Sequence, residues 1–180
     1  MKKIICIFSF IAFCISIVLS QPKDVPGFMN TRWGMTDEEI LKAMKDDAVK
    51  LKSKKMFRVS YANVGLKEIT IDSNKFIGYF LMNEDTKTLS QVNLNIVYQH
   101  LEDNFETYES LKKHFIKEYG NPTRERSEMR GNSHNKALLW IFPSTVILVS
   151  AWGNNLENLM IQYFKNVGKT PEQFGFKEKK

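Results

Sequence analysis

The chain has 180 residues, of which 43% are hydrophobic and 12% aromatic, and its formal net charge is +6. This composition excludes an intrinsically disordered protein, because such chains lack the apolar residues that a core requires. The charge is too small to indicate nucleic-acid binding. The length fits one ordinary domain whose core is large enough to be stable.

The first 20 residues, 1–20, predict a signal peptide. Lys2 and Lys3 precede an apolar run from Ile4 to Leu19, and the chain turns polar after Ser20. A short cationic head followed by an apolar core is typical of a secretory signal, so we expect cleavage before Gln21. The run is shorter than the roughly 20 residues that span a bilayer as a helix, which makes an uncleaved membrane anchor the less favoured alternative. The sequence therefore predicts an exported protein, either periplasmic or secreted.

Both cysteines, Cys6 and Cys14, lie in this segment. A bacterial lipoprotein signal requires a small residue before the modified cysteine, whereas the bulky Phe13 precedes Cys14. A lipid anchor is therefore the minority interpretation. Cleavage before Gln21 leaves a domain without cysteine, which forms no disulfide and depends on its core alone.

The first helix is predicted from Asp37 to about Val49. Thr36 and Glu39 have the spacing of a capping box, and three acidic residues occupy the first turn, where the helix dipole favours negative charge. The following lysines, from Lys50 to Lys55, are interpreted as a solvated linker. Strands are then expected at about 57–61, 66–71, 75–82 and 89–99, with turns at 63–65, 72–74 and 83–86.

The segment 89–99 has the clearest strand alternation in the chain. One face is apolar and the other carries uncharged polar side chains, which is typical of a half-buried strand in an antiparallel sheet. The apolar residues are Val92, Leu94, Ile96 and Tyr98, and the polar residues are Gln91, Asn93, Asn95 and Gln99.

A second helix is predicted over 105–119, because aromatic and aliphatic residues recur at spacings of three and four. Gly120 and Pro122 end it. An edge strand and a loop are expected within 123–136, and strands at about 137–142, 145–151 and 157–165. All three tryptophans, Trp33, Trp140 and Trp152, are expected in or near the core.

The order of these elements is a helix and about four strands, repeated once. We therefore predict an α+β fold of two tandem helix-plus-antiparallel-sheet units, with both helices packed on one face of a curved sheet. The units are pseudo-repeats at about 31–99 and 104–165 within a single domain of residues 21–168. A polar tail, 169–180, follows, in which Phe174 and Phe176 are the residues able to dock.

The stretch Thr31–Ile40 resembles the opening of many small exported bacterial proteins of unassigned function, in which Trp-Gly-Met-Ser/Thr leads into an acidic helix. The run Tyr119–Pro122 is similar to their second unit. The same short motifs are found in outer-membrane assembly lipoproteins of the SmpA/OmlA type and in the β-lactamase inhibitor protein fold of two helix-plus-sheet repeats. The resemblance implies this architecture and a protein-binding role. It implies no functional residue, and the lipid-attachment signal and the inhibitor's cysteines are missing here.

No catalytic, cofactor-binding or metal-binding motif is found in the sequence. The histidines, His100, His114 and His134, lack the close spacing of zinc ligands, and solvated or capping roles suit them better. The chain has no Gly-x-Ser-x-Gly motif, which is a strong signal for acyl-transfer enzymes. The adjacent carboxylates, interpreted as helix-dipole partners or solvated groups, are Glu38-Glu39, Asp46-Asp47, Glu84-Asp85 and Glu102-Asp103. We therefore expect a protein that is not an enzyme and has no cofactor.

Two stretches remain as candidates for binding. The residues from Lys50 to Arg58 include five cations, which suit anionic lipid headgroups or an acidic partner, although a solvated linker is favoured. The polar face of 91–99 suits recognition of a protein or glycan, although a merely solvated face is favoured. The predicted function is a protein-binding or envelope-assembly module whose partner is another envelope or extracellular protein, without nucleic acid. The alternative is a periplasmic carrier that holds a small molecule or lipid between the helices and the sheet.

Overall fold

The computed structural model describes residues 24–97 and 104–177. The predicted signal peptide, both cysteines, Gln99 and His100 lie outside these ranges. The helices are α1 (Asp37–Met44) and α2 (Asn104–Tyr119), with the short 3-10 helices η1 (Lys45–Asp47) and η2 (Pro171–Phe174). The strands are β1 (Ala48–Phe57), β2 (Ser60–Ile71), β3 (Asn74–Asn83), β4 (Leu89–Ile96), β5 (Arg124–Arg130), β6 (Ser133–Ile141), β7 (Thr145–Gly153) and β8 (Asn158–Lys165).

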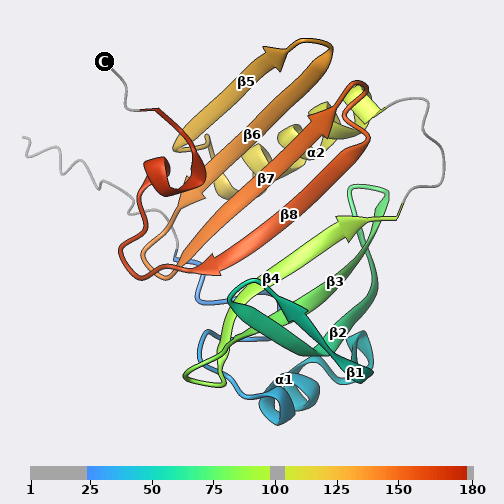
Figure 1. Ribbon diagram of the computed structural model, residues 1–180, viewed down its shortest axis with the longest axis vertical. Coiled ribbons are helices and arrows are strands. Elements are labelled where there is room, and N and C mark those ends of the chain that lie inside the picture. Colours follow the sequence, from blue (N-terminus) through green and yellow to red (C-terminus); the bar gives the residue numbers. More distant parts are fainter. Residues whose placement is uncertain (1–23, 98–103, 178–180) are drawn as a thin grey trace, which may run out of the picture.

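The eight strands form one open antiparallel sheet in the order β1-β2-β3-β4-β8-β7-β6-β5 (Figure 1). The predicted α+β class and antiparallel sheet are therefore confirmed. The first four strands and the last four form two half-sheets, which pair with each other through β4 and β8. The two tandem units and the placement of both helices on one face stay predictions. No helix in the described ranges is long and apolar enough to cross a membrane.

A row of buried side chains crosses the middle of the sheet. Residues paired directly across antiparallel strands share a face. The pairs Phe80–Val92, Val92–Tyr163, Tyr163–Ile147 and Ile147–Trp140 run from β3 to β6, and each of these five side chains is at most 4% exposed. One continuous hydrophobic core therefore extends from one half-sheet into the other.

The opposite face of the second half-sheet is covered by the C-terminal segment. Phe176 is 4% exposed and packs with Leu139 and Val146, and the ring of Phe174 lies 5.1 Å from that of Phe164. Arg126 donates to the Gly175 carbonyl and fixes this segment to β5. The segment predicted as a polar tail is thus packed on the sheet as far as Phe176.

The first helix is shorter than predicted. Its start is confirmed, since Thr36 and Glu39 form the expected capping box. The prediction that it reaches Val49 is wrong, because Lys45 has a positive φ of 50° that ends it after Met44. Ala48, 7% exposed, does join the core, but as the first residue of β1.

Two further predictions in the first half are wrong. The lysine-rich stretch is not a linker but most of strand β1. The turn expected at 63–65 is the middle of the continuous strand β2, and the chain reverses earlier, between Phe57 and Ser60. Gly65 fits there because a Cβ at this position would lie 2.9 Å from Leu51 Cδ2. The glycine thus makes room for the β1 side chain.

The tryptophan predictions succeed in part. Trp140 is 2% exposed, and Trp33 is half-buried against the core. Trp152 is 38% exposed, so its assignment to the core is wrong. Trp152 lies on the same face of β7 as Val146 and Leu148, the face that the C-terminal segment covers. The hydrophobic cluster of Val146, Leu148 and Phe176 on that face does not include Trp152.

We expect the exposed lysines of β1 to oppose pairing of the sheet with a second copy. Strand β1 is an edge of the sheet, and Lys50 and Lys52 on it are exposed. Charged side chains on an edge strand oppose edge-to-edge association. We expect the double variant Lys50→Val/Lys52→Val to form dimers or aggregates in size-exclusion chromatography with light scattering. The matched variant Lys113→Val/Lys117→Val, on an exposed face of α2, should stay monomeric; equal association of both would contradict this role.

Candidate functional site

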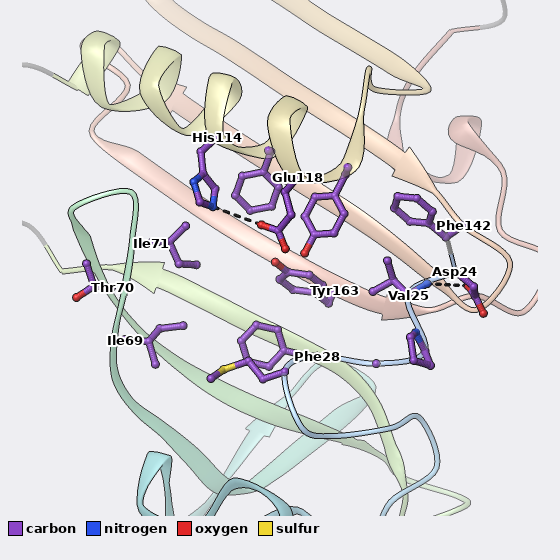
Figure 2. Close-up of a pocket in the computed structure, with 15 residues that line it drawn as sticks. Asp24, Val25, Phe28, Ile69, Thr70, Ile71, His114, Glu118, Phe142 and Tyr163 are labelled. Atoms are coloured by element: carbon purple, nitrogen blue, oxygen red, sulfur yellow. Dashed lines mark hydrogen bonds and ion pairs between the residues drawn. The ribbon is translucent and has the colours of Figure 1, made fainter. Parts of the chain in front are cut away.

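A cavity of about 590 Å³ opens where the two half-sheets meet (Figure 2). Its walls come from five separate parts of the chain: the segment 24–29, the end of β2, the second half of α2, Phe142 between β6 and β7, and Tyr163 of β8. The 15 lining residues are Asp24, Val25, Pro26, Gly27, Phe28, Met29, Ile69, Thr70, Ile71, His114, Phe115, Glu118, Tyr119, Phe142 and Tyr163.

The segment 24–29 is held against both half-sheets and closes one side of the cavity. The Asp24 carboxylate accepts hydrogen bonds from the Ser144 amide at 2.9 Å and from its hydroxyl at 2.6 Å. The buried hydroxyl of Thr145 donates to the Val25 carbonyl and accepts from Trp33 Nε1. Further along, Met35 and Gly34 exchange backbone hydrogen bonds with Leu89 of β4. The stretch 24–35 therefore ties the first half-sheet to the second.

A tight turn brings this segment close to its own backbone. A Cβ at Gly27 would lie 2.1 Å from the Thr31 carbonyl oxygen, so only glycine fits there. The turn is held by a hydrogen bond from the Thr31 amide to the Phe28 carbonyl. As a result Phe28 is buried and its ring lies 4.9 Å from that of Tyr163, at the base of the cavity (Figure 2).

Five aromatic rings form much of the wall. Phe115 and Tyr119 lie on α2 with ring centroids 5.6 Å apart, and Phe142 follows at 5.8 Å from Tyr119. The other two rings that line the cavity are those of Phe28 and Tyr163, which contact each other. Val25, Ile69 and Ile71 add aliphatic surface. The interior is therefore mainly apolar, as is typical of small-molecule sites.

A short chain of polar groups enters this apolar wall. Tyr119 interacts with both Tyr163 and Glu118, and these interactions affect the pKa values of the two tyrosines. Glu118 also lies 3.4 Å from His114 Nε2, one helical turn earlier (Figure 2). Tyr163 is buried whereas the Glu118 side chain is 51% exposed. The chain of polar groups thus leads from the base of the cavity to its mouth.

The environment of these groups fixes their charge. Burial raises the pKa of Tyr163 and of Tyr119, and the hydrogen bond to Glu118 raises that of Tyr119 further. Both hydroxyls are therefore neutral donors near neutral pH. The hydrogen bond from the Ser144 hydroxyl lowers the pKa of Asp24, which keeps that carboxylate ionised.

A second hollow, of about 730 Å³, lies beside α2 and β5. It is lined mainly by charged and polar side chains, several of which are already engaged. Lys112 pairs with Glu125, and Arg126 donates to Asn135 and to carbonyls of the C-terminal segment. The apolar cavity at the meeting of the half-sheets is the better candidate for a ligand site.

The residues singled out in the sequence fall mostly outside this cavity. The cations of β1 lie on the sheet edge, and two of them cover rings, Lys54 over Tyr61 at 3.9 Å and Lys55 over Tyr79 at 4.3 Å. Of the two histidines in the described ranges, His134 stacks edge-on against Phe105, and His114 lines the cavity. In the described ranges no group of three or more potential ligands is placed to hold a metal ion.

The predicted polar face is occupied by hydrogen bonds within itself. Asn93 Oδ1 accepts from Gln91 Nε2 at 2.6 Å and from Gln162 Nε2 at 3.1 Å. These side chains are half-buried. Among the adjacent carboxylates, Glu39 caps α1, and none of the described pairs lines the cavity.

One feature of the sequence, the spacing of four residues on α2, could have indicated the cavity. His114 and Glu118 are four residues apart, as are Phe115 and Tyr119, so the two pairs lie side by side on α2. Nothing in the sequence, however, brings 24–29 or 69–71 to the same place.

Comparison of the chain with protein-family models, with curated proteins and with solved structures finds no match. The geometry of the cavity is therefore what indicates a function.

The two hydrogen-bonded tyrosines make stability fall at alkaline pH. Their pKa values are raised in the folded protein, so unfolded chains lose these protons first once the pH exceeds about 10. The free energy of unfolding should then fall by up to about 1.4 kcal/mol per pH unit for each such tyrosine. Urea unfolding at about pH 9 and about pH 11 measures this loss. Tyr119→Phe/Tyr163→Phe should show a smaller loss over the same interval, and an unchanged loss would contradict the assignment.

Proposed function

We propose that this chain is an exported, non-enzymatic carrier that binds a small, mainly apolar ligand in the cavity between α2, the sheet and the segment 24–29. The observation that supports the proposal is the cavity itself. Its volume of about 590 Å³ falls within the roughly 300–1,000 Å³ of small-molecule sites. It lies between a helix and the sheet, the place expected for the carrier alternative.

The polar groups suit orientation of a ligand more than its conversion. The Glu118 carboxylate at the mouth and the neutral hydroxyls of Tyr119 and Tyr163 deeper in the cavity can align the polar end of a mainly apolar ligand. Glu118 is engaged by Tyr119 and His114 rather than placed against a nucleophile. Binding followed by release is the function that this arrangement supports best.

The protein-binding role predicted from the sheet face has less support. Asn93 already accepts two hydrogen bonds from neighbouring side chains, which reduces what this face offers to a partner. A protein-binding or envelope-assembly module whose partner is another envelope protein stays a prediction. Export to the periplasm or beyond is part of the proposal and rests on residues 1–20.

We also propose that the fold arose by duplication of a helix and four strands. The element order α1 then β1 to β4 recurs as α2 then β5 to β8. The order in the sheet is symmetric, since the last strand of each half lies at the centre. Side chains of both helices, among them Met44 and Phe115, belong to one core cluster, which supports their placement on a common face. The order agrees with the implied β-lactamase-inhibitor-like arrangement.

A carrier should hold its ligand when it is isolated. We expect native mass spectrometry of the protein, purified after export from a bacterial host without detergent, to show a species heavier than the chain. Organic extraction should then release a small molecule. A clean mass of the empty chain from several preparations would count against the carrier.

A larger side chain that fills the cavity should abolish retention of the ligand. Ile71 lines the cavity and is half-buried at the end of β2, so Ile71→Trp places an indole in the ligand's space. Ile77→Trp is the matched control, because Ile77 is 42% exposed on β3 and lines no part of the cavity. We expect the first variant to purify without the extra mass and the second to keep it. Equal retention by both folded variants would place the ligand elsewhere.

A further inference from the structure

The cavity has a charge opposite to that of the rest of the chain. The protein carries 26 Lys and Arg against 20 Asp and Glu. None of the 15 lining residues is Lys or Arg, whereas two, Asp24 and Glu118, are carboxylates. In a basic protein, a cavity lined by two carboxylates, in which the one basic residue, His114, is paired with Glu118, disfavours an anionic ligand.

The rings of the cavity also differ from other rings in the molecule. Elsewhere in the described ranges, cationic side chains cover aromatic faces, with Lys136 5.0 Å from the Tyr108 centroid and Arg126 5.0 Å from that of Phe176. In those same ranges, none of the cation–ring contacts involves a ring that lines the cavity. The cavity rings are Phe28, Phe115, Tyr119, Phe142 and Tyr163.

Rings and carboxylates together favour one chemical class of ligand. The negative face of an aromatic ring attracts a cation within about 6 Å of its centroid, and quaternary ammonium groups are recognised in this way. Glu118 lies on the same stretch of α2 as Phe115 and Tyr119, and all three line the cavity, so an ammonium group near its carboxylate is also near rings. The aliphatic residues Val25, Ile69 and Ile71 leave apolar surface for the rest of the molecule.

We infer that the cavity binds an apolar organic cation, a molecule with a hydrocarbon or aromatic body and one protonated or quaternary amine. The inference rests on the proposed carrier function and adds the ligand class to it. The amine lies beside Glu118 at the mouth, and the body extends along the rings and Val25. A fatty acid or another anionic lipid would bring a negative group against Glu118 and Asp24.

Three probes with the same alkyl chain separate this inference from the carrier function. Decyltrimethylammonium, decyl sulfate and decanol, each below its micelle-forming or solubility limit, are titrated calorimetrically into the processed protein. We expect the cation to bind about tenfold or more tightly than the other two, since a desolvated cation–ring contact and a nearby carboxylate both contribute. Comparable binding of all three would overturn the ligand class and leave the carrier. Binding of none would overturn both.

Two variants test which groups recognise the amine. Glu118→Gln removes the charge at the mouth and should weaken the cation about tenfold while leaving decanol unchanged. Phe142→Leu removes one ring and should also weaken the cation more than decanol. The matched controls are Glu109→Gln, on α2 but outside the cavity, and Phe174→Leu, on the opposite face of the sheet. Unchanged cation affinity in both test variants, with unchanged unfolding midpoints, would overturn the inference.

Discussion

The pairing of β4 with β8 is the interaction on which the rest of the structure depends. It runs over five residue pairs, from Gln91–Phe164 to Asn95–Met160, and joins two four-stranded half-sheets into one. Val92 and Leu94 face Tyr163 and Ile161 across it, and all four are buried. Without this pairing the hydrophobic core would not continue from one half-sheet into the other. Tyr163 would then not form part of the cavity wall.

The cavity is a consequence of how the sheet is joined at this place. In the described ranges, β4–β8 is the one strand pairing between the two half-sheets, and the cavity lies next to the C-terminal half of α2. The segment 24–29 covers part of that space and is held there by Ser144 and Thr145, residues about 120 positions away in sequence. A site built from such distant parts is fixed by the fold as a whole.

Local chemistry accounts for the parts of the fold that the sequence predicted correctly. The capping box at Thr36, the alternation around Val92 and Leu94, and the glycine stop at Gly120 each involve only a few neighbouring residues. The predictions that were wrong also depended on local sequence patterns. The lysine-rich strand β1 does not show the expected alternation of apolar and polar residues, because β1 is an edge and most of its side chains face water.

The candidate site could not be predicted in the same way. Its polar pair, His114 and Glu118, was visible as a helical spacing, but its walls depend on the β4–β8 pairing and on the path of 24–29. Both are long-range features that no local pattern specifies. The sequence anticipated a space between helix and sheet only as one alternative, and the volume and charge of that space come from the structure.

The most direct test of this account is methyl NMR of the processed protein during a titration with decyltrimethylammonium. The account predicts shifts concentrated at the methyl groups of Val25, Ile69 and Ile71, which line the cavity. Ile141 and Leu148, which pack on the opposite face, should stay in place. Shifts confined to that opposite face, or spread evenly over the molecule, would contradict a ligand site at the meeting of the two half-sheets.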